Sequence, residues 1–203
     1  LIDVIGREEK ICNYLDMPIQ HASDEILRRM GRHTDQNAIR ELIGRLRKKI
    51  PDICIRTTLI SGFPGETQED HAELMAFVKD MQFDRLGVFT YSREEGTPAY
   101  DFDGQIDETT AMERMDAIMT RQREISQEKN RAFVGKKMRV LIEGHLENED
   151  AYMARTYRDA PDVDGSLFIQ TKRELMSGDL VDVIVTGAHE YDLIGELADE
   201  SAE

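Results

Sequence analysis

The sequence predicts two architectures in succession, an α/β part with a parallel sheet and then a small all-β barrel of the OB-like type. Two observations lead to this prediction. Over the first two-thirds of the 203 residues, helical stretches alternate with short apolar stretches, which is typical of repeated strand–loop–helix units. After Gly135, five short runs of alternating apolar and polar residues follow within roughly 60 residues, which favours a small closed barrel.

The α/β part begins with a weak unit and continues with a clear helix. A strand is predicted over residues 11–18, and Ser23 can cap a short helix that runs to Met30. A second helix is predicted over residues 37–50, because its apolar residues recur at helical offsets and basic residues cover the other faces. Pro51 ends this helix.

Two stronger strand–loop–helix signals follow. Residues 53–60 are β-branched and almost entirely apolar, as expected for a buried parallel strand. The turn-rich loop 62–65 comes next, and Thr67 can cap a helix that extends to Met81. A further strand is predicted over residues 86–91, followed by a polar loop over residues 92–100.

The second part of the chain starts after a long polar helix, which is predicted over residues 109–133. We place the domain boundary between Val134 and Gly135, so that residues 1–134 form one domain and residues 135–203 the other. The five strands of the second domain are predicted over residues 137–143, 151–157, 166–171, 180–186 and 191–196. An acidic tail follows, with Asp199, Glu200 and Glu203.

The start of the chain indicates a piece of a longer protein. It begins Leu1-Ile2-Asp3, with neither a methionine nor the charged-then-apolar pattern of a signal peptide. Three strand–loop–helix units are also too few to close an α/β barrel, which takes eight. We therefore expect that a preceding part of the first domain lies outside this sequence.

Charge and cysteine content narrow the classes of function. The net charge of −15 disfavours general binding to nucleic acids, and it makes a basic protein partner plausible. No apolar run approaches the roughly 20 residues that a membrane span needs. Cys12 and Cys54 form neither a disulfide framework nor a CxxC or CxxxCxxC metal motif, and we interpret them as reduced thiols of a cytoplasmic protein.

Candidate ligand-binding residues gather where the predicted parallel strands end, the edge at which such folds bind ligands. Gln20, His21 and Ser23 follow the first strand and could hydrogen-bond hydroxyl or amide groups of a ligand. A single histidine is more often structural, so that alternative stays open. Arg56 lies inside an apolar strand, where it would pair with either an internal carboxylate or a ligand carboxylate.

The next two strand ends carry further candidates. Gly62, Phe63, Pro64, Gly65 and Glu66 form a loop whose glycines allow close approach to a ligand, and the phenylalanine could stack on a ring. Tyr91, Ser92 and Arg93 open the polar loop after the last strand, which could also be an ordinary solvated connection. The chain contains no P-loop, GxGxxG, GxSxG or HExxH motif.

Three long motifs occur in order and at suitable spacing, namely Leu15–Asp24, Arg56–Thr67 and Gly87–Tyr100. They resemble the radical-SAM methylthiotransferases, and they are most similar to the branch that methylthiolates an aspartate of a small-subunit ribosomal protein. Residues 135–197 resemble the TRAM domain that ends these enzymes, including Ala160–Gly165 and Tyr191–Gly195. The resemblance covers essentially the whole chain.

The resemblance implies a partial TIM-like radical-SAM barrel followed by TRAM. It also implies S-adenosylmethionine and two [4Fe–4S] clusters as cofactors of the full-length enzyme. The CxxxCxxC that holds the radical-SAM cluster is absent from this sequence, so no metal ligand is assigned and the chain by itself should be inactive. In the family, a 5′-deoxyadenosyl radical removes a hydrogen from an unactivated carbon, which requires no general base from this chain.

Individual residues acquire expected roles from this resemblance. Gln20, His21 and Ser23 should lie near the ribose and methionine part of the cofactor. Arg56 is a candidate for binding its carboxylate, and Gly62 to Glu66 for its adenine side. Tyr91, Ser92 and Arg93 should line the entrance for the substrate. No residue of the chain is assigned a catalytic proton transfer.

The substrate class can be weighed by charge. Residues 135–197 contain seven basic and 13 acidic side chains, a net charge of −6. A barrel that grips RNA should be basic, so a basic ribosomal protein is the expected partner. Two alternatives stay open: a tRNA adenosine methylthiotransferase and, for this chain alone, a non-catalytic module that binds substrate.

Overall fold

The computed structural model describes residues 1–147 and 149–199, which form two compact units. Residues 1–8 and 15–125 make up the first unit, and residues 9–14 with the chain from Ser126 onward make up the second. Glu200 and Glu203 of the predicted acidic tail lie outside the described residues. Along the described ranges, no helix is both long and apolar enough to cross a membrane.

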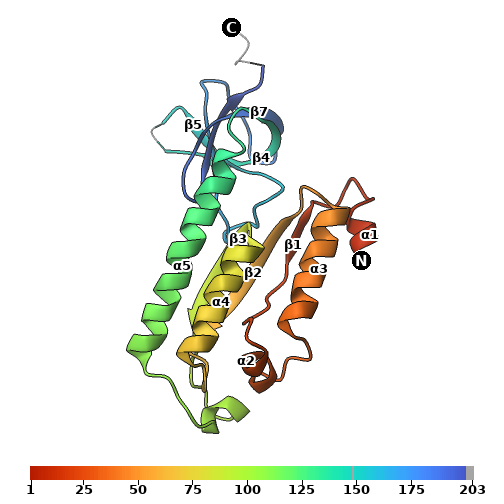
Figure 1. Ribbon diagram of the computed structural model, residues 1–203. Helices are drawn as coiled ribbons and strands as arrows, with labels where there is room; N and C mark the ends of the chain where they lie inside the picture. Colours follow the sequence, from red (N-terminus) through yellow and green to blue (C-terminus); the bar gives the residue numbers. More distant parts are fainter. Residues whose placement is uncertain (148, 200–203) are drawn as a thin grey trace. The chain divides into compact units, whose positions relative to one another are not determined.

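The α/β part alternates strands and helices as predicted (Figure 1). Its elements are α1 (Ile2–Ile5), β1 (Tyr14–Asp16), α2 (Asp24–Arg29), α3 (Gln36–Lys49), β2 (Cys54–Ser61), α4 (Gln68–Met81), β3 (Arg85–Thr90), the 3-10 helix η1 (Pro98–Asp101) and α5 (Glu108–Arg131). The strand predicted over residues 11–18 is shorter than expected. Pro18 has no N–H for a ladder, and Gln20 adopts a left-handed conformation that ends the extended run.

Side-chain caps fix where the helices begin. The Ser23 hydroxyl accepts from the N–H of Ile26 at the start of α2, and Asp35 accepts from Ala38 at the start of α3. At the start of α4, Thr67 and Asp70 form a reciprocal capping box. The caps predicted at Ser23 and Thr67 are thus confirmed. Because the caps fix the helix starts, they also fix the loops that lead into them from the strands.

The sheet of the first unit has the strand order β1-β2-β3. Strands β2 and β3 are parallel, and the register pairs Arg56 with Arg85 and Ser61 with Thr90. Apolar side chains from the helices and from β2 and β3 form one core, in which Phe77, Phe83, Ile55 and Leu59 are fully buried. The parallel arrangement places the carboxyl ends of β2 and β3 at one edge of the sheet.

The second unit contains the predicted closed barrel, with strands joined in the order β4-β5-β6-β8-β7. Its strands are β4 (Lys137–His145), β5 (Ala151–Arg155), β6 (Leu167–Gln170), β7 (Leu180–Ala188) and β8 (Leu193–Leu197). Strands β6 and β8 pair in parallel, and the other neighbours are antiparallel. Alternate side chains fill the interior, among them Val140, Ile142, Leu167, Ile169 and Val183.

Polar groups tie the chain around the barrel. The guanidinium of the buried Arg158 lies 4.1 Å from the ring centre of Phe133, which precedes the barrel. The Tyr14 hydroxyl donates to Asp164 at 2.8 Å, a contact within the second unit between residues far apart in the sequence. Gly135, with φ 83°, donates its N–H to the carbonyl of Val185 and so leads the chain into β4.

Candidate functional site

All the predicted candidates except Arg56 lie on the segments that meet at the carboxyl edge of the three-stranded sheet. The Gln20 carbonyl accepts from the N–H of Ile60, and the Tyr91 N–H donates to the carbonyl of Ser61, both at 2.8 Å. Gly62 to Glu66 follow Ser61 directly. The segments after β1, β2 and β3 therefore adjoin one another, as expected for a ligand site at a parallel sheet edge.

Gln20 holds an unusual backbone conformation at this edge. Its φ is 71°, a left-handed value that a residue with a Cβ adopts only at a cost of about 1 to 3 kcal/mol. Backbone hydrogen bonds to Thr58 and Ile60 of β2 hold the residue in place. Strained residues of this kind concentrate at functional sites, so the conformation supports the selection of Gln20 from sequence.

The loop after β2 needs glycine at two positions. Gly62 has φ 75°, and a Cβ there would collide with the Cβ of Ala111. Gly65 has φ 89°, and a Cβ there would come within 2.8 Å of the guanidinium of Arg29. Arg29 also donates to the carbonyl of Pro64 at 2.9 Å. The loop is thus fixed in one shape by its neighbours before any ligand arrives.

Phe63 and Tyr91 form the apolar part of the site. Their ring centres lie 5.2 Å apart in an edge-to-face arrangement, and Phe102 adds a second such contact with Phe63 at 6.3 Å. Phe63 is buried, so its ring packs within this aromatic group. Ser92 and Arg93 are exposed, and they bond within their own loop to Glu94 and Tyr100. The structure therefore places Tyr91 at the edge with Phe63.

Glu66 turns inward from the same loop. Only 2% of the residue is exposed, and its carboxylate accepts from the backbone N–H groups of Gly62 and Phe63. Arg114 lies 3.2 Å from the other carboxylate oxygen and also donates to the Glu66 carbonyl at 2.9 Å. Burial raises the pKa of Glu66, while the bonds from Gly62 and the charge of Arg114 oppose that rise. The carboxylate therefore anchors the loop from beneath.

His21 and Ser23 also face the interior. The Nδ1 atom of the fully buried His21 accepts from the Ser23 N–H at 2.9 Å, so Nε2 carries the proton of the neutral ring. Burial lowers the pKa of His21 to about 4, although the charge of Asp70 opposes this. The Ser23 hydroxyl donates to Asp70 at 2.5 Å. Burial disfavours the Asp70 carboxylate, but the bonds from Ser23 and Thr67 outweigh it and lower its pKa.

Five buried polar atoms around this edge have no hydrogen-bond partner among the described residues, namely Nε2 of His21, the hydroxyl oxygen of Tyr91, Oε1 of Glu66, Nδ1 of His71 and Nε of Arg114. The last three belong to the charged group around the Glu66 carboxylate. A buried donor that lacks a partner is costly, and such atoms are commonly satisfied by water or by a ligand. The edge thus offers hydrogen-bonding groups that fit a polar ligand.

Arg56 lies apart from this group. It precedes Ser61 by five residues on β2, which corresponds to about 16 Å along a strand. Its guanidinium forms an ion pair with Asp16 at 2.7 Å. Of the two interpretations left open by the sequence, the structure contains the pairing with a carboxylate of the chain itself, although Asp16 is exposed rather than internal.

Sequence reasoning missed the support beneath the loop, namely Arg114 of α5 and His71 of α4. Burial lowers the pKa of His71, whose Nδ1 lies 3.8 Å from Glu66. Both residues lie on the buried side of amphipathic helices, where a polar side chain interrupts the apolar pattern. A polar residue at an otherwise apolar helix position is the sequence signal that could have indicated these two residues.

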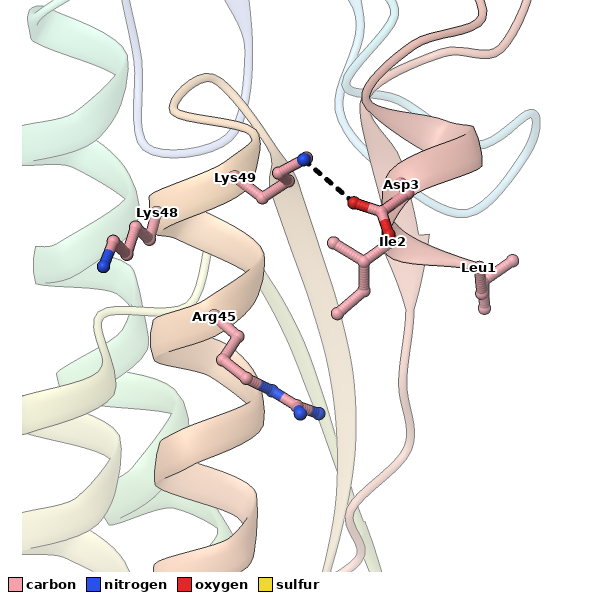
Figure 2. Close-up of a pocket in the computed structure, with 6 residues that line it drawn as sticks. All are labelled: Leu1, Ile2, Asp3, Arg45, Lys48 and Lys49. Carbon is pink, nitrogen blue, oxygen red and sulfur yellow. Dashed lines mark ion pairs between the residues drawn. The ribbon is translucent and has the colours of Figure 1, made fainter.

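A hollow of about 530 Å³ lies beside α1 and the end of α3, and Arg45, Lys48 and Lys49 are among the residues that line it (Figure 2). Figure 2 shows the ion pair between Lys49 and Asp3, at 2.9 Å. The sequence had indicated only a solvated basic helix face here. No predicted site residue lines this hollow, so it is distinct from the sheet edge.

Neither cysteine belongs to a disulfide or to a metal-binding group among the described residues. Cys12 is exposed and Cys54 is buried. Within the described parts of the chain, no group of three or more His, Cys, Asp or Glu side chains is arranged to hold a metal ion.

Comparison with known proteins indicates the class of protein to which the chain belongs. Residues 2–78 match the radical SAM superfamily, and residues 134–198 match the TRAM domain. The chain therefore combines a radical-SAM sequence with a TRAM barrel. The ribosomal protein uS12 methylthiotransferase RimO of Lachnoclostridium phytofermentans is 55% identical over 96% of this chain, and that of Acetivibrio thermocellus is 49% identical over 100% of it.

The same name belongs to a relative from Geobacter sulfurreducens, which is 48% identical over 97% of the chain. The chain belongs to the radical-SAM methylthiotransferase family. It spans 44 to 45% of the length of these three relatives. The cofactors of this family are S-adenosylmethionine and [4Fe–4S] clusters, and the described residues contain no group of His, Cys, Asp or Glu side chains that could hold a metal ion.

Proposed function

We propose that this chain is part of a radical-SAM methylthiotransferase that adds a methylthio group to an aspartate of the small-subunit ribosomal protein uS12. The observation that carries the proposal is the 55% identity over 96% of the chain to a relative named for that activity. Two further relatives with the same name, at 48 and 49% identity, support it. We place the enzyme in the cytoplasm, where ribosomal proteins are made.

In this proposal the α/β part is one portion of a TIM-like barrel, and the domain boundary lies between Val134 and Gly135. The parallel pairing of β2 with β3 supports the first point, because parallel strands joined by helices are the repeating unit of such barrels. For the second point, the TRAM match begins at residue 134. The left-handed Gly135 gives the chain a turn at this position.

S-adenosylmethionine is proposed to bind at the carboxyl edge of the sheet. Gln20, His21 and Ser23 would face its ribose and methionine part, and Gly62, Phe63, Pro64, Gly65 and Glu66 its adenine side. The unpartnered Nε2 of His21 and the hydroxyl of Tyr91 support a polar ligand here. When bound, the cofactor supplies the radical that removes a hydrogen from the substrate.

The chain's own residues prepare this site. Glu66 would act through the loop, because its carboxylate holds the N–H groups of Gly62 and Phe63. Arg56 lies five residues before the end of β2, so it would bind the cofactor carboxylate only if the cofactor extended along β2 and displaced Asp16. Tyr91, Ser92 and Arg93 would line the entrance for the substrate. Cys12 and Cys54 are not proposed as cluster ligands. The cluster, and with it turnover, would depend on residues of the full-length enzyme.

The acidity of the barrel supports a protein substrate. With a net charge of −6 over residues 135–197, it would repel a phosphate backbone and attract a Lys/Arg-rich protein. We therefore expect general nucleic-acid binding to be weak. The alternative, modification of a tRNA adenosine, shares the radical-SAM and TRAM parts but has no observation in its favour here.

The experiment is a reaction of the full-length, cluster-loaded enzyme with purified uS12 and, separately, with tRNA. Mass spectrometry should find a methylthio group on an aspartate of uS12 and none on the tRNA. Modification of tRNA alone would overturn the proposed substrate. Loss of cofactor binding in His21→Asn and Gly62→Ala variants, measured by equilibrium dialysis, would test the site separately.

A further inference from the structure

The outer surface of the TRAM barrel carries an apolar row that the core does not require. Met153 of β5 lies opposite Phe168 of β6, and Phe168 lies opposite Ile194 of β8. Their neighbours Tyr152, Ile169 and Leu193 are buried in the barrel interior. Because side chains alternate along a strand, Met153, Phe168 and Ile194 point outward. We call these three residues the outer row.

The outer row is accessible. Ile194 is 36% exposed, and Met153 and Phe168 are half-buried. Three large apolar side chains in register on adjacent strands form a continuous patch, unlike the isolated apolar residues that are common on surfaces. Such patches mark places where another molecule binds.

A hollow of about 690 Å³ lies beside the outer row, and Phe168, Ile194 and Leu146 supply its apolar wall. Its charged rim is acidic, formed by Glu149, Asp150 and Asp192. Among the described residues that line it, none is a lysine or an arginine, and His189 is the one basic type. The Asp192 carboxylate is held in place by the Ser166 N–H at 2.8 Å. The hollow therefore combines an apolar wall with a fixed negative charge.

We propose that this hollow, together with the outer row, binds a segment of the protein substrate that presents an apolar side chain flanked by lysine or arginine. This inference rests on the proposed function and assigns substrate docking to one face of the barrel. The apolar side chain would cover Phe168 and Ile194, and the flanking cations would face Glu149, Asp150 and Asp192. Charge complementarity selects this occupant, because an RNA phosphate backbone would meet three carboxylates.

The barrel topology restricts how the segment can bind. Both β6 and β8 are paired on each side, so neither has a free edge to which a further strand could add. The segment must therefore be recognised through its side chains rather than through main-chain pairing. This makes the predicted binding sensitive to side-chain substitutions in the outer row and to salt, because Glu149 and Asp150 of the acidic rim are exposed.

The test measures the affinity of this 203-residue chain for purified uS12 by calorimetry at two salt concentrations. One variant, Glu149→Lys/Asp150→Lys, reverses the rim charge, and another, Phe168→Ala/Ile194→Ala, truncates the outer row. Each should weaken binding by about tenfold or more. The charge variant should also lose most of the salt dependence. A matched control, Glu113→Lys/Asp116→Lys, makes the same charge change at exposed positions of α5 and should bind as the unaltered chain does.

Circular dichroism of each variant checks that the barrel remains folded, and both pairs of substitutions lie outside its interior. Equal binding by all four proteins would overturn the inference, as would RNA that competes for the hollow. An activity assay of the full-length enzyme on uS12 distinguishes failure of this inference from failure of the proposed function. If the enzyme modifies uS12 while the variants bind normally, the docking face is wrong; if it does not modify uS12, the proposed function is wrong.

Discussion

Acidification should destabilise the first unit through His21. In the folded chain this imidazole is buried and its pKa is about 4, whereas its ordinary value is 6.5. Below pH 6.5 His21 becomes protonated in the unfolded chain but stays neutral in the folded chain. Its contribution to the free energy of unfolding is therefore fully present above pH 6.5 and is lost as the pH decreases toward 4. A tenfold change in proton affinity corresponds to about 1.4 kcal/mol, which gives a total loss of about 3 kcal/mol.

Between pH 7 and pH 5, the loss expected from His21 alone is about 2 kcal/mol. Glu66 acts in the opposite direction: its pKa is raised, so the stability that it contributes is present at low pH and decreases as the pH rises above 4.5. His71, with a lowered pKa, adds to the effect of His21. The pH dependence of the free energy of unfolding is therefore the sum of several groups' contributions, and the contribution of His21 must be isolated by substitution.

The assay is urea unfolding of the chain and of His21→Asn at pH 7 and pH 5, followed by the helical signal in circular dichroism. An asparagine oxygen can accept from Ser23 in place of Nδ1 but does not titrate, so its structural cost should be the same at both pH values. The variant should lose about 2 kcal/mol less than the unaltered chain on acidification. His33→Asn removes an exposed histidine and serves as the control. Equal losses in the unaltered chain and in His21→Asn would refute the reasoning.

Other substitutions test the loop after β2. Gly62→Ala forces a side chain into a left-handed conformation and against Ala111, and should lower the free energy of unfolding by about 2 kcal/mol or more. The control Gly44→Ala lies within helix α3 with open space around it, and should instead raise it by about 0.5 to 1 kcal/mol. Glu66→Ala leaves the buried Arg114 without its carboxylate and should cost about 3 to 5 kcal/mol in urea unfolding. A cost below about 1 kcal/mol would show that this pair does not anchor the loop.

Local signals in the sequence were enough to predict most of the elements. The helix predicted over residues 37–50 is observed at Gln36–Lys49, because apolar spacing and Pro51 both act within a few residues. The five barrel strands were likewise visible as alternating runs. The caps at Ser23 and Thr67 were predictable because a capping side chain and the backbone N–H that donates to it lie only three residues apart.

The candidate site was predictable in position but not in detail. Parallel strands end at a common edge, so the grouping of Gln20, Gly62 and Tyr91 follows from topology. The pairing of Arg56 with Asp16 does not, because its partner lies 40 residues away. The inward turn of Glu66 depends in the same way on Arg114, a contact that local pattern cannot indicate.

The two sheets of this chain differ in one respect that matters for handling it. The barrel is closed, but the three-stranded sheet of the described residues has β1 and β3 at its edges. Phe89 of β3 is 62% exposed on such an edge. An edge strand that carries an exposed aromatic side chain can act as a template for pairing between chains. Aggregation in concentrated solution should therefore start at β3, and a Phe89→Lys substitution should suppress it while leaving the barrel untouched.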